Sequence, residues 1–506
     1  MKNKFLKIEE IKKKVSELKK KKLKIVHCHG VFDIVHIGHI KHLKKAKDQG
    51  DILIVTVTSD KFVNKGSNRP IFNQKKRLEF LSELESVDFV CLSNFASATN
   101  LIKLIKPNIY VKGQDYKNSK NDKTGKINFE TQLIKKFGGK IVFTHEETFS
   151  SSNIINDNFS YVGDQLEFLR SISKKYSLDY IEEVFKKISK LKVLVIGETI
   201  IDQYNFCEAL GKSGKEPYLA MKDINSENYL GGAAAIANHL ADFAKKIKLI
   251  SVVGEKNEYK NFIQKKLNKK VKTFFFKKSK SPTILKKRFL DNVNKTKLFG
   301  IYSINDDIFS PKEDTKIKKY IDKNIKNFDL IIVSDYGHGF ISETSAKKIS
   351  KAKKFVTLNA QINASNIGYH SLQNYKNIGA TIINETEVRH EMRNKNENIK
   401  SLSLKLQKKI KTKNLIVTRG KNGAIIFNNK DKNIIECPAF ANIVIDKVGA
   451  GDAMLSILSM LIKVGTPSDL ALLLGSFAGV YSVETMGNSY SLNKKIFLRH
   501  LEFALK

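Results

Sequence analysis

Short apolar runs alternate with stretches in which apolar residues recur every three or four positions. The runs at residues 24–28, 51–57, 87–92, 108–112 and 140–144 predict buried parallel strands with helices between them, including a helix over residues 73–84. The same alternation begins again at residue 191. The later expected strands are at residues 191–196, 249–253, 330–334, 355–358, 381–383, 415–417 and 424–427. Strands linked by helices predict an α/β fold with two doubly wound domains.

A length of 506 residues is too great for one ordinary core, which agrees with two domains. We expect an N-terminal Rossmann-like domain over residues 1–157 and a second domain over residues 191–506. Residues 158–190 are charged, helical in pattern and without a strand signal, so they are interpreted as a helical connector. Ser177 or Asp179 is its expected helix cap.

The formal net charge of +39 favours a nucleic-acid or surface partner, but the distribution of charge weakens that interpretation. Only eight of the 90 basic residues are arginine, and the lysines are spread over the whole length. We therefore expect a compositional bias and no nucleic-acid partner. A basic binder remains an alternative, which clustering of lysines on one face would favour.

Four distant cysteines without a CxxC pair suit a reducing cytoplasm. The N-terminal 22 residues lack the continuous apolar core of a signal peptide. The most apolar region, residues 453–483, is interrupted by Lys463, Gly465, Pro467 and Asp469, and predicts two buried helices. A cytoplasmic location and no membrane partner are expected.

The stretch HGVFDIVHIGH, residues 29–39, joins the first strand to a helix. His36 and His39 flank Gly38 where that helix begins, and the exposed N–H groups and the helix dipole favour a phosphate there. Two imidazoles can donate hydrogen bonds to phosphates as charge develops at phosphorus. Ordinary packing is one alternative. A zinc site is another, although the spacing of the nearby histidines and Cys28 fits no common ligand pattern.

Five strings, FDIVHIGH, RPIFNQKKR, ESVDFV, VKGQDY and SSSNII, occur in order between residues 24 and 157. This region resembles the HxGH nucleotidyltransferases, and within them the nucleotidyltransferase half of the bifunctional heptose 7-phosphate kinase/heptose 1-phosphate nucleotidyltransferase family. The resemblance implies transfer of a nucleotide from ATP or CTP to a sugar 1-phosphate with release of pyrophosphate. His36 and His39 would bind the triphosphate. Further nucleotide or phosphate contacts are expected from His29, Gly30, Asp33, Gly38, Arg77, Lys112, Ser151 and Ser152. For the serines, a plain helix cap is the alternative.

In the second domain, Val448-Gly449-Ala450-Gly451-Asp452 opens an apolar helix. Small residues expose successive N–H groups that can stabilise a phosphoryl group in transfer. Asp452 can accept the proton of an attacking sugar hydroxyl. A tight turn before a helix is the alternative for this string alone.

Four further motifs precede this glycine string in the sequence: Gly231-Gly232, Ser334-Asp335-Tyr336, Asn384-Glu385-Thr386-Glu387 and Val417-Thr418-Arg419-Gly420. The order of the five motifs is similar to that in ribokinase-like sugar kinases. The resemblance covers residues 191 to about 498 and implies Asp452 as catalytic base. It places the remaining contacts as follows: Gly449, Ala450 and Gly451 as the anion hole, Thr418 and Gly420 near ATP, Asn384 and Glu387 near Mg²⁺ through water, and Asp202, Gly231, Gly232 and Asp335 at the sugar.

Some residues depart from this pattern. Ala235 stands where an asparagine is usual, Asn359 lies where an aspartate is usual, and Val448 replaces a threonine. The two halves also stand in the reverse of the familiar order. The first two changes motivate an alternative in which the second domain is a non-catalytic sugar-binding or regulatory module. The leading hypothesis is a bifunctional enzyme of carbohydrate metabolism that acts on sugar phosphates and nucleoside triphosphates as a homo-oligomer.

Overall fold

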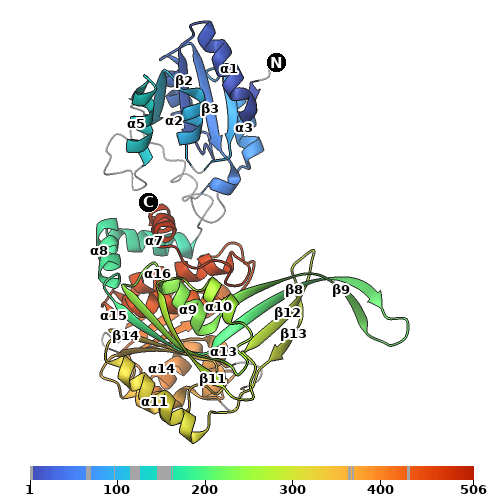
Figure 1. Cartoon of the computed structure of the whole chain (residues 1–506). Coiled ribbons are helices and arrows are strands. Elements are labelled where there is room, and N and C mark those ends of the chain that lie inside the picture. Colours follow the sequence, from blue (N-terminus) through green and yellow to red (C-terminus); the bar gives the residue numbers. More distant parts are fainter. Residues whose placement is uncertain are drawn as a thin grey trace. The chain divides into compact units, whose positions relative to one another are not determined.

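The computed structural model describes residues 4–63, 70–95, 97–113, 126–144, 161, 163–362, 366, 370–429 and 433–505, without the side chains of residues 126–128 and 433. The chain folds as two compact units, Met1–Val162 and Gly163–Leu505 (Figure 1). Within the described ranges, no helix has the length and apolar character needed to cross a membrane.

The first unit is built on a six-stranded parallel sheet in the order β1-β4-β3-β2-β5-β6. Its elements are β1 (Phe5–Leu6), α1 (Ile8–Lys20), β2 (Ile25–Gly30), α2 (Ile37–Lys47), β3 (Ile52–Thr58), α3 (Gln74–Ser82), β4 (Phe89–Ser93), α4 (Thr99–Ile105), β5 (Ile109–Gly113), α5 (Lys126–Lys136) and β6 (Lys140–Thr144).

Both faces of this sheet are buried, which explains the continuous apolar runs. Val26 packs into one core cluster with Leu43, while Ile25 packs into another with Ile11. The chain runs from β2 outward to β3 and β4 and then returns to β5 on the other side of β2. The carboxyl ends of β2 and β5 therefore form a topological switch point, where α/β folds bind ligands.

The second unit contains a nine-stranded sheet in the order β11-β10-β7-β14-β15-β16-β17-β18-β19, antiparallel only at its last two pairings. Its strands are β7 (Lys192–Gly197), β10 (Lys246–Gly254), β11 (Val271–Lys278), β14 (Leu330–Asp335), β15 (Phe355–Ala360), β16 (Ala380–Asn384), β17 (Asn414–Thr418), β18 (Ala424–Asn428) and β19 (Asn433–Cys437). Its switch point lies between β7 and β14.

Helices cover this sheet. They are α7 (Asp164–Lys175), α8 (Leu178–Ile188), α9 (Gly232–Leu240), α10 (Lys260–Lys266), α11 (Pro311–Ile325), α12 (Glu343–Ser350), α13 (Glu385–Met392), α14 (Ile399–Ile410), α15 (Ala450–Lys463), α16 (Ser468–Val483) and α17 (Lys494–Leu505). Ser177 caps α8 by accepting a hydrogen bond from the Tyr180 N–H. Phe185 of α8 packs on Phe243 and Phe497, so this part of the expected connector belongs to the second unit.

A four-stranded sheet in the order β13-β12-β8-β9 completes the second unit. It comprises β8 (Thr199–Lys212), β9 (Leu219–Gly231), β12 (Leu285–Asp291) and β13 (Lys297–Ser303). Figure 1 shows β8 and β9 extending well beyond the larger sheet. The structure confirms the α/β class that the apolar pattern predicts. The pattern does not predict this four-stranded sheet, which we call the lid sheet, because most of its residues are polar or exposed.

Candidate active sites

The two histidines of the first unit meet at the N-terminus of α2, as expected. His36 is the N-cap, and its Nδ1 accepts a hydrogen bond from the Gly38 N–H at 3.1 Å. The His36 N–H reaches His39 Nδ1 at 3.4 Å, and the two ring centroids are 4.1 Å apart. Because both Nδ1 atoms accept, both neutral rings carry their proton on Nε2. Burial lowers the pKa of His36, which favours this neutral donor form.

The loop before these histidines is held by buried polar contacts. His29 Nδ1 lies 2.8 Å from Thr56 Oγ1, and buried Asp33 accepts a hydrogen bond from the Phe72 N–H at 3.1 Å. A Cβ at Gly30 would lie 2.9 Å from the ring of Phe32, so a larger residue there would require this ring to shift. These residues shape the strand-to-helix turn, and they lie at the switch point between β2 and β5.

Arg77 is fully buried, and its guanidinium forms hydrogen bonds and an ion pair with other residues of the first unit. Its guanidinium donates to the backbone oxygens of Phe72, Val31 and Thr58 and pairs with Asp60 at 2.6 Å. The charge that the sequence assigned to a phosphate is thus already balanced by a carboxylate. This geometry favours a role for Arg77 in anchoring α3 to the ends of β2 and β3.

Lys112 lies near the carboxyl end of β5, beside β2, and its Nζ is 3.5 Å from Glu130 Oε2. Ser151 and Ser152 lie outside the described residues. The zinc alternative gains no support, because the described residues contain no group of three or more His, Cys, Asp or Glu side chains suited to a metal ion.

In the second unit, the glycine string forms the N-terminus of α15. Gly449 has a φ of 92°, and a Cβ there would lie 2.1 Å from Asn488 Oδ1, so glycine is required. Among the described residues, no side chain caps this helix end, and a Cβ at Gly451 would meet none of their atoms within 4 Å. The N–H groups of Gly449, Ala450 and Gly451 therefore fit an anionic phosphoryl group.

Asp452 follows in the first turn of α15. The Tyr336 hydroxyl donates to Asp452 Oδ1 at 2.8 Å. Burial raises the pKa of Asp452, the hydrogen bond from Tyr336 lowers it, the charge of Asp202 raises it and that of Lys286 lowers it, and the resulting pKa is about 7. A carboxylate with this pKa is suited to general-base catalysis near neutral pH.

The expected sugar-binding residues lie beside this carboxylate. Asp202 of β8 forms an ion pair with Arg288 of β12. A Cβ at Gly231 would lie 2.3 Å from Asp202 Oδ2, and Gly232 has a φ of 59°. The double glycine thus lets the turn into α9 lie directly against Asp202.

Asp335, at the end of β14, has a different environment. It accepts hydrogen bonds from the Tyr375 hydroxyl at 2.7 Å and from the Gly337 N–H at 3.1 Å. Glu198, just after β7, accepts from the N–H groups of Tyr336 and His338. Burial raises the pKa of Glu198 to about 7. These two carboxyl groups fix the loop that carries Tyr336.

Asn384 and Glu387 form a reciprocal helix cap at the start of α13. The Glu387 N–H donates to Asn384 Oδ1 at 2.9 Å, and the Asn384 N–H donates to Glu387 Oε2 at 2.8 Å. Burial raises the pKa of Glu387 to about 7. Asn384 faces Thr418 across β16 and β17, and Gly420 follows with a φ of 56°.

Sequence reasoning named no role for Glu198, Tyr336, Lys286 or Arg288. Lys286 and Arg288 alternate along β12, a strand that the apolar pattern did not predict. A buried lysine is also hard to detect in a chain with so many exposed ones. The rarity of arginine could have drawn attention to Arg288.

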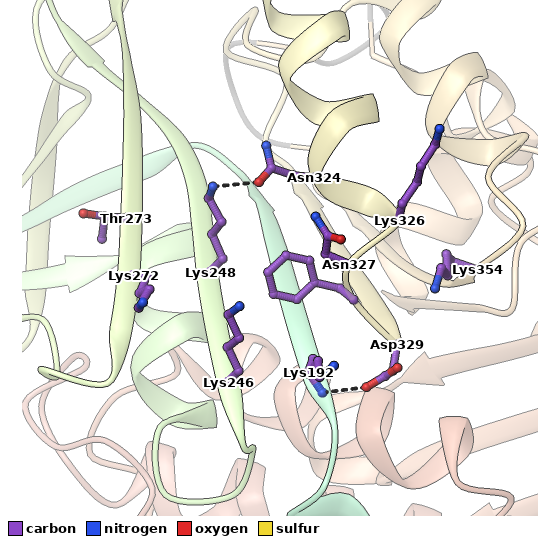
Figure 2. A pocket seen from close by; sticks show the side chains of 11 residues that line it. Lys192, Lys246, Lys248, Lys272, Thr273, Asn324, Lys326, Asn327, Asp329 and Lys354 are labelled. Carbon is purple, nitrogen blue, oxygen red and sulfur yellow. Dashed lines mark hydrogen bonds between the residues drawn. The ribbon is translucent and has the colours of Figure 1, made fainter.

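Six lysines cluster around a hollow in the second unit. The hollow has a volume of about 630 Å³, with Asp329 as the only carboxylate among the lining residues (Figure 2). Lys248 donates to Asn324 Oδ1 at 2.7 Å there. The hollow lies at the amino ends of β7 and β10, the edge of the sheet opposite to Asp452. It is therefore separate from the candidate kinase site.

Comparison with known proteins supports the two-part organisation. Residues 190–495 match the pfkB family of carbohydrate kinases, and residues 27–158 match a family described as cytidylyltransferase-like. The matched nucleotidyltransferase-like part therefore precedes the kinase part.

Two relatives are named bifunctional protein HldE. The protein of Aliarcobacter butzleri is 44% identical over 135 residues, which cover 26% of this chain and 28% of the relative. The protein of Nitratiruptor sp. is 48% identical over 111 residues, which cover 22% of this chain and 24% of the relative. The matches thus span only about a quarter of these relatives. They confirm the resemblance stated for the N-terminal region.

A solved structure, phosphofructokinase-2 from Escherichia coli, overlaps 62% of this chain and 100% of its own with a TM-score of 0.50 at 12% identity. This likeness shows the fold of the second unit.

Proposed function

The chain belongs to the pfkB family of carbohydrate kinases, and we propose that it is a bifunctional enzyme of sugar-nucleotide biosynthesis. The second unit transfers a phosphoryl group from MgATP to a hydroxyl of a heptose-like sugar or sugar phosphate. The first unit joins a nucleotide from ATP or CTP to a sugar 1-phosphate and releases pyrophosphate. The observation that carries the proposal is Asp452, a half-buried carboxyl group whose surroundings raise its pKa to about 7, beside a helix N-terminus that no described side chain caps.

The kinase step follows from this arrangement. Asp452 accepts the proton as the sugar hydroxyl attacks the terminal phosphorus of ATP. The N–H groups of Gly449 to Gly451 stabilise the charge on the transferred group. Tyr336 holds the carboxylate in place through its 2.8 Å hydrogen bond.

Asn384 and Glu387 fit a magnesium ion held through water, because Mg²⁺ prefers oxygen ligands and keeps much of its hydration. Their reciprocal cap fixes both side chains at the carboxyl edge of the sheet. When bound, the ion neutralises charge on the ATP phosphates. Thr418 and Gly420, across from Asn384, are proposed to contact ATP.

The transferase step rests on the paired imidazoles at α2. Their Nε2–H groups donate to the triphosphate as the sugar phosphate attacks and pyrophosphate leaves. Lys112 and Ser151 and Ser152 are proposed as further phosphate contacts. His29, Gly30, Asp33, Gly38 and Arg77 shape or anchor the turn that presents the histidines.

The sugar is proposed to lie against Asp202, Gly231 and Gly232, with Asp335 holding the adjoining loop. Ala235 and Asn359 favour the second candidate, a non-catalytic sugar-binding module. The Asn359 amide donates to the Ile382 backbone oxygen at 2.8 Å. Saturable sugar binding without ATP turnover would favour that candidate.

The direct test is to assay purified protein with a panel of nucleotides and sugars. ADP formation with a heptose or heptose phosphate is expected, together with pyrophosphate release from ATP or CTP and heptose 1-phosphate. Absence of pyrophosphate with every sugar phosphate would overturn the transferase proposal. Absence of ADP with every acceptor would overturn the kinase proposal.

We also propose self-association through the lid sheet, which exposes several large apolar side chains, including Leu210, Leu219, Phe299 and Ile301. A cytoplasmic location is proposed because Cys28, Cys91, Cys207 and Cys437 are buried free thiols and both reactions use nucleoside triphosphates.

A further inference from the structure

Lys286 is a buried cation in the kinase site. It lies on β12 directly across from Asp202 in the parallel pairing with β8, and its residue is 8% exposed. Among the residues that the structure describes, its ammonium forms neither a hydrogen bond nor an ion pair. The carboxylate of Asp202 is paired with Arg288 instead, two residues further along the same face of the strand. Among the described residues, no carboxylate thus lies within ion-pair distance of the Lys286 ammonium, although the charges of Asp202, Glu198 and Asp306 act on it from further away.

The position of this ammonium relates it to the proposed base. Lys286 Nζ is 5.9 Å from the ring centroid of Tyr336 and 5.7 Å from that of Tyr302. Tyr336 in turn donates its hydroxyl hydrogen bond to Asp452. The charge of Lys286 also lowers the pKa of Asp452.

A buried ammonium without a partner is costly, and proteins rarely keep one unless a ligand completes its environment. Burial lowers the pKa of Lys286, whereas the charges of Asp202, Glu198 and Asp306 oppose that change. The neighbouring tyrosine rings offer only weak cation–π contacts at these distances. A phosphate oxygen would supply both the opposite charge and a hydrogen-bond acceptor.

We propose that Lys286 is a catalytic-site residue that binds a phosphate oxygen brought in by a substrate of the kinase reaction. This inference rests on the proposed kinase activity of the second unit and extends it to a residue that no sequence motif indicated. Two sources can supply the oxygen: a phosphate already carried by the acceptor sugar, or the phosphoryl group that leaves ATP. The chemistry of the contact is the same for both.

The test uses the full-length chain with Lys286→Met and Lys286→Arg. Lys287→Met is the matched control, because it removes a lysine from the next position of the same strand, where the side chain points to the opposite face. Steady-state rates are measured with a free sugar and with its phosphate ester. Binding of inorganic phosphate is measured by calorimetry without ATP, and melting temperatures are recorded for all proteins.

Lys286→Met is expected to lose about 10²-fold in kcat/KM, by analogy with loss of one charge-stabilising donor, with partial recovery in Lys286→Arg. A loss confined to the phosphorylated acceptor assigns the oxygen to the sugar. An equal loss with both acceptors, seen in kcat, assigns it to the transferred group. The melting temperature without ligand should not fall, because an unpaired buried charge has been removed.

Wild-type rates in Lys286→Met with both acceptors would overturn the inference, as would a lowered melting temperature with unchanged phosphate binding. The phosphate measurement separates this failure from failure of the proposed function. If the wild type phosphorylates no acceptor yet binds phosphate in a Lys286-dependent manner, the kinase proposal fails and the anion contact stands.

Discussion

At the scale of single residues, the proposed kinase site depends on how its surroundings set the protonation of Asp452. Burial and Asp202 raise its pKa, while Lys286 and the Tyr336 hydroxyl lower it, and the balance lies at about 7. Because a base must be ionised, kcat/KM should rise with pH and level off above about pH 7.

Tyr336→Phe removes the hydrogen bond that favours the ionised form of Asp452. The acidic limb of the kcat/KM profile should therefore move to higher pH by about one unit. Tyr320→Phe, remote from Asp452 and stacked on Phe274, is the control and should leave the limb in place. An unshifted profile for Tyr336→Phe would show that Asp452 does not limit the rate as a base.

Asp452→Asn should change the pH dependence of stability. The folded pKa of about 7 exceeds the ordinary carboxyl value of 3.8, so the carboxyl group stabilises the fold at low pH, and this contribution is lost as pH rises to about 7. Asparagine does not titrate. The variant should therefore gain about 2 kcal/mol relative to wild type between pH 5 and pH 8. Urea unfolding at both pH values measures this difference, and a constant difference would contradict the assigned pKa.

Replacing either histidine of the pair, His36 or His39, tests the proposed transferase site. His36→Ala or His39→Ala removes one Nε2–H donor and should reduce pyrophosphate release by about 10²- to 10³-fold. Phosphorylation by the same protein should be unchanged and serves as the internal control. A parallel fall in both activities would indicate loss of folding instead.

At this scale, sequence reasoning predicts some candidate site residues and misses the surroundings of others. It predicts Asp452 and the histidines as site residues because glycine-rich turns before helices leave a clear local pattern. It could not show that Arg77 is enclosed by carbonyl oxygens and Asp60, since those partners lie up to 46 residues away. The surroundings of Lys286 likewise depend on strand pairing, which a single sequence does not reveal.

At the scale of elements, the buried strands followed from their apolar runs and the lid sheet did not. β7 and β14 are buried along nearly their whole length, whereas much of β9 and β13 is exposed. A polar strand is stabilised by pairing with its neighbours, and this leaves little periodic signal. The lid also supplies Asp202, Lys286 and Arg288, so the least predictable element carries part of the site.

Arg77 connects α3 to the ends of β2 and β3, so its replacement tests how much these contacts stabilise the first unit. Arg77→Met leaves Asp60 and three backbone oxygens without their donor and should destabilise the first unit by about 3–5 kcal/mol. Transferase activity should be lost at a lower temperature than in wild type, while kinase inactivation is unchanged. Lys76→Met, at an exposed neighbouring position, is the control and should match wild type.

At the scale of the whole molecule, the sequence predicted two α/β units and their order, and both family matches agree with this. The high positive charge was interpreted as compositional. The structure nevertheless places six lysines around one hollow at the amino edge of the larger sheet. Such clustering arises from strands distant in sequence, so composition alone could not reveal it.

Self-association is the prediction that belongs to this scale. Phe299→Glu with Ile301→Glu places charges on the exposed apolar face of the lid sheet and should lower the mass measured by light scattering to that of one chain. Ile308→Glu, at an exposed apolar residue outside that sheet, is the control. A wild-type protein that is already monomeric would contradict the proposed assembly.

Measuring both reactions on Asp452→Asn decides whether the chain holds two separate active sites. We expect ADP formation with the sugar acceptor to fall by about 10²- to 10⁴-fold, while pyrophosphate release from ATP or CTP and heptose 1-phosphate stays at the wild-type rate. An equal loss of both activities, or unchanged phosphorylation, would contradict this expectation.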